Sequence, residues 1–537
     1  MGTRRAERGV RGIPGGVRER GARPGGEGPD VPVLVVGAGP VGLSTGMFLA
    51  HWGVEALVID KRDPMVTVPR ASTTLRTLEL FRAVGLGPAT EREGWDGGEP
   101  VRWVFKDSGL GATRHHGGLP PRYAAWLANC TPVPVRRVLT HDQVQRLARA
   151  ELTGRGGRAR FGLRLVGLTA ERDRVRARLV DVETGEEREI TASYLIGADG
   201  AKSEVRRLLG IDMPDRAPIA HLNTAFFRAD LGTAMEEWGT HLCFVRNDAV
   251  HATLMSKNGR DQWSSHLMGY PGKPAEGPAE LTPDATVALL RAAIGDPAIP
   301  IQLHAVNAWE AATGLASAFR RGRVFLAGDA AHVQSSAGGL GMNTGIQDGH
   351  NLAWKLAAVL HGACAPGLLD TYEPERRAAA QASLAVSRGL HQGYQSLSGD
   401  PNALYDRLAV DYLRGMVCYG YPPHATEGEL PDPLDDTVRL GHRFPHRWLN
   451  SPDGGRRSTL DLIGSRWTLF TAADGARWRA TATAGPGPTP RVRELGDAPA
   501  RELGLAGDAV LVRPDGFVAW RGTAGAGRSL RAALHAT

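Results

Sequence analysis

Residues 31–62, VPVLVVGAGPVGLSTGMFLAHWGVEALVIDKR, constrain the fold more than any other part of the chain. A β-branched run leads into Gly37-x-Gly39-x-x-Gly42, a helical stretch follows, and a second apolar run ends in Asp60. This order is typical of a βαβ unit in which glycines permit a tight turn, approach of a pyrophosphate and helix–strand packing. The N-terminus of the helix, with its free N–H groups and partial positive charge, favours binding of a phosphate, and Asp60 is placed to bind a ribose hydroxyl. The segment predicts a Rossmann-like α/β domain, but it does not show whether the bound dinucleotide is NAD or FAD.

Length and charge narrow the remaining possibilities. A chain of 537 residues is expected to form two to four domains. Its net charge is +7, and the Arg/Gly-rich residues 1–30 hold seven arginines and four acids, so we expect a disordered tail there. No nucleic-acid-binding motif accompanies the charge, so no nucleic-acid partner is expected. Residues 31–50 are uncharged, but their Gly and Pro fit a strand–turn–helix better than a membrane span.

The cysteines and histidines suggest neither disulfides nor a metal. The four cysteines form no CxxC pair, which favours reduced thiols and a cytoplasmic location. The scattered histidines, His115-His116 among them, show no metal-ligand spacing, so no metal site is expected.

Two further motifs end apolar strands with an acidic residue and a glycine. In residues 192–211, ASYLIGADGAKSEVRRLLGI, Asp199-Gly200 precedes a helix in the pattern DGxxSxVR, where the acid could also simply cap that helix. In residues 325–345, FLAGDAAHVQSSAGGLGMNTG, Asp329 precedes a glycine-rich loop and a helix expected from Asn343 to Leu360. A carboxylate there can bind polyol hydroxyls, and the helix start aims N–H groups at an electron-rich ring. His332 is expected to be a packed loop residue.

Together the three motifs resemble the family of single-component FAD-dependent aromatic hydroxylases, which have a para-hydroxybenzoate hydroxylase-like fold. The stretches RVFLAGDAAH, GGLGMNTGIQDGHNLAWKLA and VPRASTTLRTLELFRAVGL match the family in order. Within it the chain looks most like the bacterial aromatic polyketide hydroxylases, which share its length and C-terminal extension. The resemblance implies FAD as cofactor, NAD(P)H and O2 as co-substrates and an aromatic polyketide as substrate.

The implied fold is α/β: a Rossmann-like FAD-binding domain, an inserted antiparallel β-sheet substrate domain and a C-terminal thioredoxin-like domain. The expected divisions are a disordered tail (1–30), the FAD-binding domain in two parts (31–211 and 306–420), the substrate sheet (212–305), a linker (421–445) and the C-terminal domain (446–537). The last domain lacks CxxC, so a packing or dimer-support role is expected, in a monomer or homodimer.

The resemblance also assigns residues to FAD and the visiting nicotinamide. The first motif would hold the pyrophosphate and Asp60 the ribose, while Arg70 would reach the pyrophosphate or the flavin side. Asp329 would hold the ribityl chain, and the N–H groups of Met342 and Asn343 would face the flavin ring. The residues implied are Gly37, Gly39, Pro40, Val41, Gly42, Asp60, Lys61, Arg70, His141, Asp199, Gly200, Arg206, Gly328, Asp329, Gly341, Met342 and Asn343. His141 stands where the family commonly has Gln, and Gly349 where Ala is usual.

Substrate residues are expected on the inserted sheet and the glycine-rich loop. Alternation in HLNTAFFRADL and DQWSSHLMGY predicts one face carrying His221 and Asn223 and another carrying His266, which could orient a phenolic ligand or face solvent. Ser335-Ser336 replace a common Pro-Pro beside the flavin, so substrate orientation could differ. Trp309 is expected in the core, and no catalytic base is named.

These features favour an FAD-dependent monooxygenase that uses NAD(P)H and O2 to hydroxylate a phenolic, polycyclic polyketide. Baeyer–Villiger insertion or epoxidation of a polyketide is the first alternative. An NAD-dependent dehydrogenase is a further alternative, but it leaves the third motif unexplained. A non-catalytic binding protein with an Arg/Gly-rich tail is the least favoured.

Overall fold

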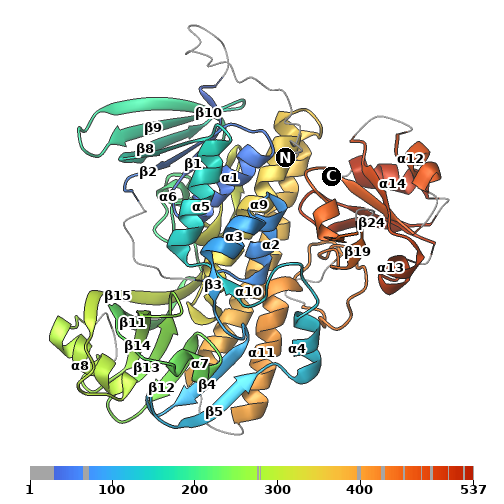
Figure 1. Ribbon diagram of the computed structural model, residues 1–537. Coiled ribbons are helices and arrows are strands. Elements are labelled where there is room, and N and C mark those ends of the chain that lie inside the picture. Colours follow the sequence, from blue (N-terminus) through green and yellow to red (C-terminus); the bar gives the residue numbers. More distant parts are fainter. Residues whose placement is uncertain are drawn as a thin grey trace, which may run out of the picture.

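The computed structural model describes residues 29–63, 72–274, 277, 280–395, 401–424, 430–451, 454–472, 475–483, 488–505, 507–523 and 526–535. Figure 1 shows two large sheets, one above the other, joined by long helices, with a smaller α/β unit to one side. Arg70 and residues 1–28, on which two of the sequence predictions fall, lie outside the described residues.

The first sheet is built around the fingerprint strand, β1, whose residues 33–35 are fully buried, as expected for a parallel strand covered on both faces. Its order is β16-β17-β10-β1-β2-β7, with the antiparallel β8 and β9 extending from β10. The strand bounds are β1 Val31–Val36, β2 Ala56–Asp60, β7 Arg158–Phe161, β8 Leu163–Ala170, β9 Val175–Asp181, β10 Glu187–Gly197, β16 Arg320–Arg321 and β17 Val324–Leu326. The three motifs end β1, β10 and β17, which are parallel neighbours, so all three meet at one edge of the sheet.

Helices α1, α5 and α9 pack together over this sheet (Figure 1). The helix bounds around it are α1 Pro40–His51, α2 Leu75–Ala83, α3 Gly87–Glu93, α5 His141–Gly154, α6 Glu204–Leu208 and α9 Leu340–Leu360. Where α1 and α9 cross, a Cβ at Gly349 would lie 2.2 Å from Thr45 Oγ1. Glycine at 349 is therefore a packing requirement here.

The second sheet has the order β18-β15-β11-β14-β13-β12-β4-β5. Its strands are β4 Arg102–Lys106, β5 Thr113–Gly118, β11 Ala217–Arg228, β12 Leu242–Arg246, β13 His251–Ser256, β14 Gln262–Gly269, β15 Gln302–Leu315 and β18 His332–Val333. It thus extends beyond the expected range 212–305, because β4 pairs in parallel with β12 and covers what would otherwise be a sheet edge. Helix α8 (Pro283–Ile294) packs on one face around Phe227, Trp238 and Trp263.

Helices α10 (Tyr372–Gln395) and α11 (Pro401–Val417) run from the first sheet toward the second (Figure 1). Short elements complete this part: β3 Trp95–Asp96, α4 Pro121–Leu127, β6 Arg137–Val138, α7 Ala234–Trp238 and the 3₁₀ turns Gly328–Ala330, Ala337–Gly339 and Pro366–Thr371. Among the described residues, no helix is long and apolar enough to span a membrane.

The C-terminal unit has the strand order β22-β21-β23-β24, in which β23 is antiparallel to the other three. Its elements are β19 Trp448–Asn450, β20 Arg456–Ser458, β21 Thr468–Thr471, α12 Gly475–Thr483, β22 Arg491–Glu494, α13 Asp497–Glu502, β23 Ala509–Val512, β24 Val518–Gly522 and α14 Gly527–His535. A βαβ unit followed by a hairpin and a helix is the thioredoxin topology. The hairpin predicted around Asp515-Gly516 is confirmed.

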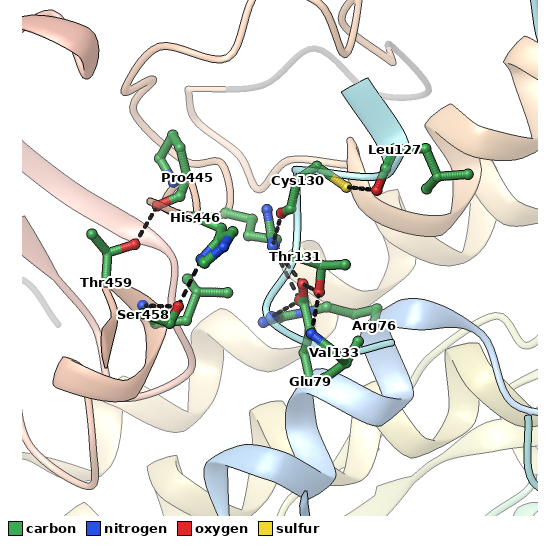
Figure 2. A network of polar contacts seen from close by, with 12 residues as sticks. Arg76, Glu79, Leu127, Cys130, Thr131, Val133, Pro445, His446, Ser458 and Thr459 are labelled. Carbon is green, nitrogen blue, oxygen red and sulfur yellow. Dashed lines mark hydrogen bonds and ion pairs between the residues drawn. The ribbon is translucent and has the colours of Figure 1, made fainter. Parts of the chain in front are cut away.

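Buried charges connect the C-terminal unit to α2, as Figure 2 shows for Glu79 and its neighbours. Glu79 accepts hydrogen bonds from Thr131 Oγ1 (2.7 Å), Arg76 Nη1 (3.0 Å) and Arg443 Nε (2.9 Å). Burial alone would raise the pKa of Glu79, but the charges of Arg443 and Arg76 outweigh burial and hold it below its usual range. Arg76 also donates to the Asp515 carbonyl at 2.8 Å, so one side chain contacts both parts.

A second buried cluster joins the same unit to α9 and α10. Glu375 accepts hydrogen bonds from Lys355 Nζ (2.7 Å) and from Arg513 Nη1 (2.6 Å) and Nη2 (2.8 Å). Asp515 accepts from Trp354 Nε1 at 3.1 Å. Burial alone would raise the pKa of Glu375, but Arg513 and Lys355 bring it down to about 2. Removing one partner of such a cluster would leave an uncompensated buried charge.

Candidate active site

The fingerprint glycines have different structural reasons. Gly37 has a positive φ of 105°, and an added Cβ would lie 2.3 Å from the Ala198 carbonyl oxygen. A Cβ at Gly42 would lie 1.8 Å from the Gly37 oxygen, so packing requires glycine at both. A Cβ at Gly39 would meet nothing within 4 Å. Pro40 is the first residue of α1 and Val41 the second, so Gly39 leaves open space directly in front of the helix N-terminus, where a phosphate is favoured.

Asp60 is anchored at the end of β2. Its carboxylate accepts hydrogen bonds from the Ala38 N–H (2.8 Å) and the Arg62 N–H (3.0 Å). Two backbone donors fix the side chain beside the fingerprint loop while leaving lone pairs for a hydroxyl group. Lys61 next to it is exposed.

The second motif, Asp199-Gly200, holds α6 and the third motif in place. Asp199 accepts from the Glu204 N–H (2.7 Å) and the Val205 N–H (3.0 Å), so it caps α6, and burial raises the pKa of its carboxyl. Gly200 has a φ of 83°. Arg206 donates to the carbonyl oxygens of Ala201 and Ala330, both at 2.9 Å, and thus ties the second motif to the third.

The third motif presents one carboxylate to a cavity. Gly328, with a φ of 61°, donates its N–H to Asp348 Oδ2 at 2.9 Å, while Asp329 projects into the cavity and remains exposed there. Protein surrounds this carboxyl, and the resulting desolvation raises its pKa. His332 is fully buried and bonds Asp348 Oδ2 at 2.7 Å, which agrees with its expected packed role.

Helix α9 begins at Leu340, three residues before the predicted start. The prediction was wrong because Gly338 and Gly339, both at positive φ, turn the chain directly into the helix. The N–H groups of Gly341 and Met342 therefore lie in the first turn, where no intrahelical partner exists, whereas the N–H of Asn343, expected together with that of Met342 to face the flavin, lies beyond it. The Asn343 side chain accepts from the Thr74 N–H and donates to the Ser72 carbonyl, so it anchors the helix start to the segment before α2.

A cavity of about 440 Å³ lies between this helix start and the second sheet. Its lining includes residues from the third motif, the glycine-rich loop and the sheet: Asp329, Ser335, Ser336, Gly341, Met342, Thr224, Phe226, Ser264, His266 and Trp309. The predicted Ser335, Ser336 and His266 are therefore brought together with the third motif.

His221 and Asn223 do not line the cavity, so the first of the two roles expected for them, contact with a ligand, is not supported. In the antiparallel pairing Thr224 lies opposite His266, and directly opposed residues share one face of a sheet. The face of β11 that reaches the cavity thus carries Thr224 and Phe226. Asn223 points to the other face, where it is buried and accepts from the Tyr270 hydroxyl at 3.1 Å.

Three cavity side chains form a hydrogen-bond chain. Trp309 Nε1, which can only donate, bonds Thr224 Oγ1 at 2.8 Å, and the same oxygen lies 2.8 Å from His266 Nδ1. If the Thr224 hydroxyl donates to Nδ1, every hydrogen in the chain has an acceptor, which places the His266 proton on Nε2. Burial, with the nearby charge of Lys257, lowers the pKa of His266 to about 4, so the ring is neutral near pH 7. Trp309 is half-buried in the cavity wall, not in the core as predicted.

His141 is the first residue of α5 and does not line the cavity. One turn further, the fully buried Gln145 donates Nε2 to the Ala38 carbonyl at 3.2 Å. Gln145 therefore ties α5 to the fingerprint loop, a contact that no sequence pattern predicted. Thr224 and Lys257 were not predicted either, because only the strand register reveals which polar residues face the cavity.

The comparisons with known proteins agree with this geometry. Residues 30–387 match the FAD binding domain family, and residues 437–537 match the aromatic-ring hydroxylase C-terminal domain. The chain belongs to the family of FAD-dependent aromatic-ring hydroxylases, and it is a flavoprotein monooxygenase.

Particular relatives define its neighbourhood further. The chain is 36% identical to an aklavinone 12-hydroxylase of Streptomyces purpurascens, covering 92% of this chain and 95% of that protein. It is 34% identical to a tetracenomycin A2 monooxygenase-dioxygenase of Streptomyces glaucescens, covering 92% and 93%. Among solved structures, an aklavinone-11 hydroxylase in ternary complex with FAD and aklavinone matches with a TM-score of 0.82 and 34% identity, covering 95% and 99%.

The residues present fit FAD. The open space at Gly39 faces the start of α1, and Asp329 enters a cavity beside the unpaired N–H groups at the start of α9. No group of histidine, cysteine or acidic side chains suited to a metal ion occurs within the described part of the chain.

Proposed function

We propose that the protein hydroxylates a phenolic, polycyclic aromatic polyketide, using NAD(P)H and O2. The observation that carries this proposal is the cavity, which places the start of α9 and Asp329 opposite the polar and aromatic face of the second sheet. Its 440 Å³ volume and its mixture of Phe226, Trp309 and hydrogen-bonding groups suit a planar, multi-ring ligand. The names of the relatives, aklavinone and tetracenomycin enzymes, support the same substrate class.

We assign the FAD contacts to three parallel strand ends. The pyrophosphate would lie at Gly39 and the α1 N-terminus, with Gly37 and Gly42 shaping the loop, and the adenosine ribose at Asp60. Asp329 would bind the ribityl chain. Asp199, Gly200 and Arg206 would keep the loop of the second motif in place. Because the second motif lies between the first and the third, it would also contact the nicotinamide of NAD(P)H.

When bound, reduced FAD supplies the centre at which O2 is activated for transfer of a hydroxyl group to the ring. The chain contributes position and electrostatics. First-turn N–H groups of Gly341 and Met342 would hold the flavin ring and stabilise negative charge on it. His266 donates from Nε2 to a substrate oxygen, and the apolar walls formed by Phe226 and Trp309 exclude water from the reacting face.

The test is incubation of the purified holoprotein with NADPH, a candidate anthracycline aglycone and ¹⁸O₂. We expect a product heavier by one ¹⁸O atom on an aromatic carbon. A ring-expanded lactone or an epoxide would refute hydroxylation in favour of another oxygenation, and NADPH oxidation unaffected by aromatic compounds would refute the substrate class.

We also propose the sequence-based divisions 31–211 with 306–420 for FAD binding and 446–537 for the C-terminal domain, with the correction that β4, β5, β15 and β18 belong to the second sheet. The four cysteines are free, which supports a reducing, cytoplasmic location. A monomer or homodimer remains our expectation for the assembly.

A further inference from the structure

Gln334 carries a buried amide nitrogen that has no acceptor among the described residues. This glutamine follows β18 directly and lines the cavity beside Asp329 and the start of α9. An amide nitrogen bears two hydrogens, and leaving a buried donor unpaired is costly. A ligand in the cavity can supply the acceptor that Nε2 lacks.

The amide is held in one orientation by helix α10. Ser383 Oγ donates to Gln334 Oε1 at 3.0 Å, and the same hydroxyl lies 3.0 Å from Thr344 Oγ1 of α9. Ser383 is 4% exposed, so this anchor is itself part of the packed interior. The neighbouring backbone is fixed as well, because Ser387 Oγ donates to the Ser335 carbonyl at 3.1 Å. With Oε1 engaged by Ser383, Nε2 is the amide atom that remains for a ligand.

Gly341 leaves a small space between this amide and the carboxylate of Asp329. A Cβ on Gly341 would lie 3.5 Å from Gln334 Nε2 and 4.0 Å from Asp329 Oδ1. Neither a positive φ nor a closer contact requires glycine at this position. The space is therefore bordered by a donor without an acceptor on one side and by a carboxylate acceptor on the other.

A hydroxyl group is the ligand that matches this pair. It has one hydrogen to donate to Asp329 and lone pairs that accept from Gln334. A carbonyl oxygen would satisfy only the amide, and an N–H group would satisfy only the carboxylate. The ribityl chain of FAD and a phenolic substrate both carry hydroxyl groups. Asp329 and Gly341 belong to the part of the site assigned to FAD, which favours the ribityl chain.

We propose that Gln334 binds FAD by donating from Nε2 to a ribityl hydroxyl that in turn donates to Asp329, and that Ser383 positions the amide for this contact. The inference rests on the proposed assignment of the ribityl chain to Asp329, and it adds the residue on the other side of the hydroxyl.

The test is the binding of FAD and of its 2′-, 3′- and 4′-deoxy analogues to the full-chain apoprotein, followed by quenching of flavin fluorescence without substrate. We expect Gln334→Met to raise the Kd for FAD about tenfold, since it removes one hydrogen bond and leaves the hydroxyl unpaired. For one of the three analogues, wild type and variant should bind equally, because the accepting hydroxyl is already missing. An unchanged Kd for FAD, or a loss shared equally by FAD and all three analogues, would overturn the proposal.

Gln381→Met is the matched control. Gln381 on α10 is also half-buried and its Oε1 also lacks a hydrogen-bond partner, but it does not line the cavity. We expect this variant to bind FAD as wild type does. A loss as large as that of Gln334→Met would mean that any change of amide in this region weakens FAD binding, and the specific contact would be refuted.

Ser383→Ala tests the positioning of the amide. It should raise the Kd for FAD by roughly two- to fivefold. Combined with Gln334→Met it should add nothing to the loss from Gln334→Met alone, because Ser383 acts only through the amide. Additive losses would contradict that role. If Gln334→Met does not fold, Ser383→Ala with the three analogues replaces it, and the effect should again disappear for one analogue; a loss common to all would overturn the contact.

These outcomes are separate from those that test the proposed function. Wild-type FAD affinity in Asp329→Ala would refute the ribityl assignment and this inference together. A wild-type Kd in Gln334→Met would refute only the role of the amide. Neither result bears on the hydroxylation reaction, because the binding measurements contain no aromatic substrate and no NADPH.

Discussion

Gly39→Ala tests whether the first motif approaches a ligand or only turns the chain. An added Cβ meets no atom within 4 Å, and the φ of −66° is open to alanine. Two small terms oppose each other: the stiffer unfolded chain favours the variant by ~0.4–1 kcal/mol, and alanine is a poorer N-cap than glycine by roughly 0.5–1 kcal/mol. We therefore expect the free energy of unfolding of the apoprotein to change by less than about 1 kcal/mol.

The effect on FAD should be larger. The new methyl group would occupy the space assigned to the pyrophosphate, so we expect the Kd for FAD to rise at least tenfold, or about 1.4 kcal/mol. Gly42→Ala is the contrasting variant, because its Cβ would lie 1.8 Å from the Gly37 oxygen and force α1 to shift. It should destabilise the apoprotein by roughly 1–3 kcal/mol. Urea unfolding of both apoproteins and quenching of FAD fluorescence on binding give the two numbers.

Wild-type FAD affinity in Gly39→Ala would refute the placement of the pyrophosphate. A loss of apoprotein stability as large as that of Gly42→Ala would instead show that Gly39 is required by packing that the structure does not reveal.

Three other changes test the site and its support. Asp329→Ala should purify with less than half of the wild-type FAD, measured from the ratio of visible to ultraviolet absorbance, and full occupancy would remove the ribityl assignment. Gly341→Val should slow anaerobic flavin reduction by NADPH in stopped flow with little change in melting temperature, since its Cβ meets Gln334 only at an ordinary 3.5 Å; unchanged reduction would mean that the glycine serves only the backbone. For Glu375, the folded-state pKa of about 2 lies below the reference value of 4.5, so the stabilisation is complete above pH 4.5 and is lost as the pH falls toward 2. Glu375→Gln should therefore be less stable than wild type at pH 7, with a gap in urea unfolding that narrows below pH 4.5, and a constant gap down to pH 3 would contradict the ionic role.

Local patterns predicted the elements and the three motifs because they depend on residues close in sequence. The fingerprint strand, its helix and the C-terminal hairpin follow from apolar runs and turn residues, and the structure confirms them. The start of α9 was misplaced because sequence does not reveal that Gly338 and Gly339 both adopt positive φ.

Features that depend on distant pairing could not be predicted. Which face of β11 lines the cavity could not be decided from the sequence, because the pairing of Thr224 with His266 is set by a partner strand about 40 residues away. The place of β4 in the second sheet and the contact of Gln145 with the fingerprint loop have the same origin. Asp199, by contrast, could be interpreted from the sequence alone, because the helix cap expected from its local pattern is what the structure shows.

The buried ionic contacts of the C-terminal unit have a consequence for engineering by domain exchange. Arg513 of the C-terminal domain and Arg443 of the segment just before it are matched to acids in the rest of the chain, Glu375 on α10 and Glu79 on α2. A chimera that takes the last hundred residues from another hydroxylase would leave Glu79 with the cation Arg76 alone and Glu375 with the cation Lys355 alone unless the donor supplies guanidinium groups at both positions. Exchange boundaries chosen from domain limits alone would therefore yield less stable chimeras, and transferring α2 and α10 with the C-terminal unit should restore the stability.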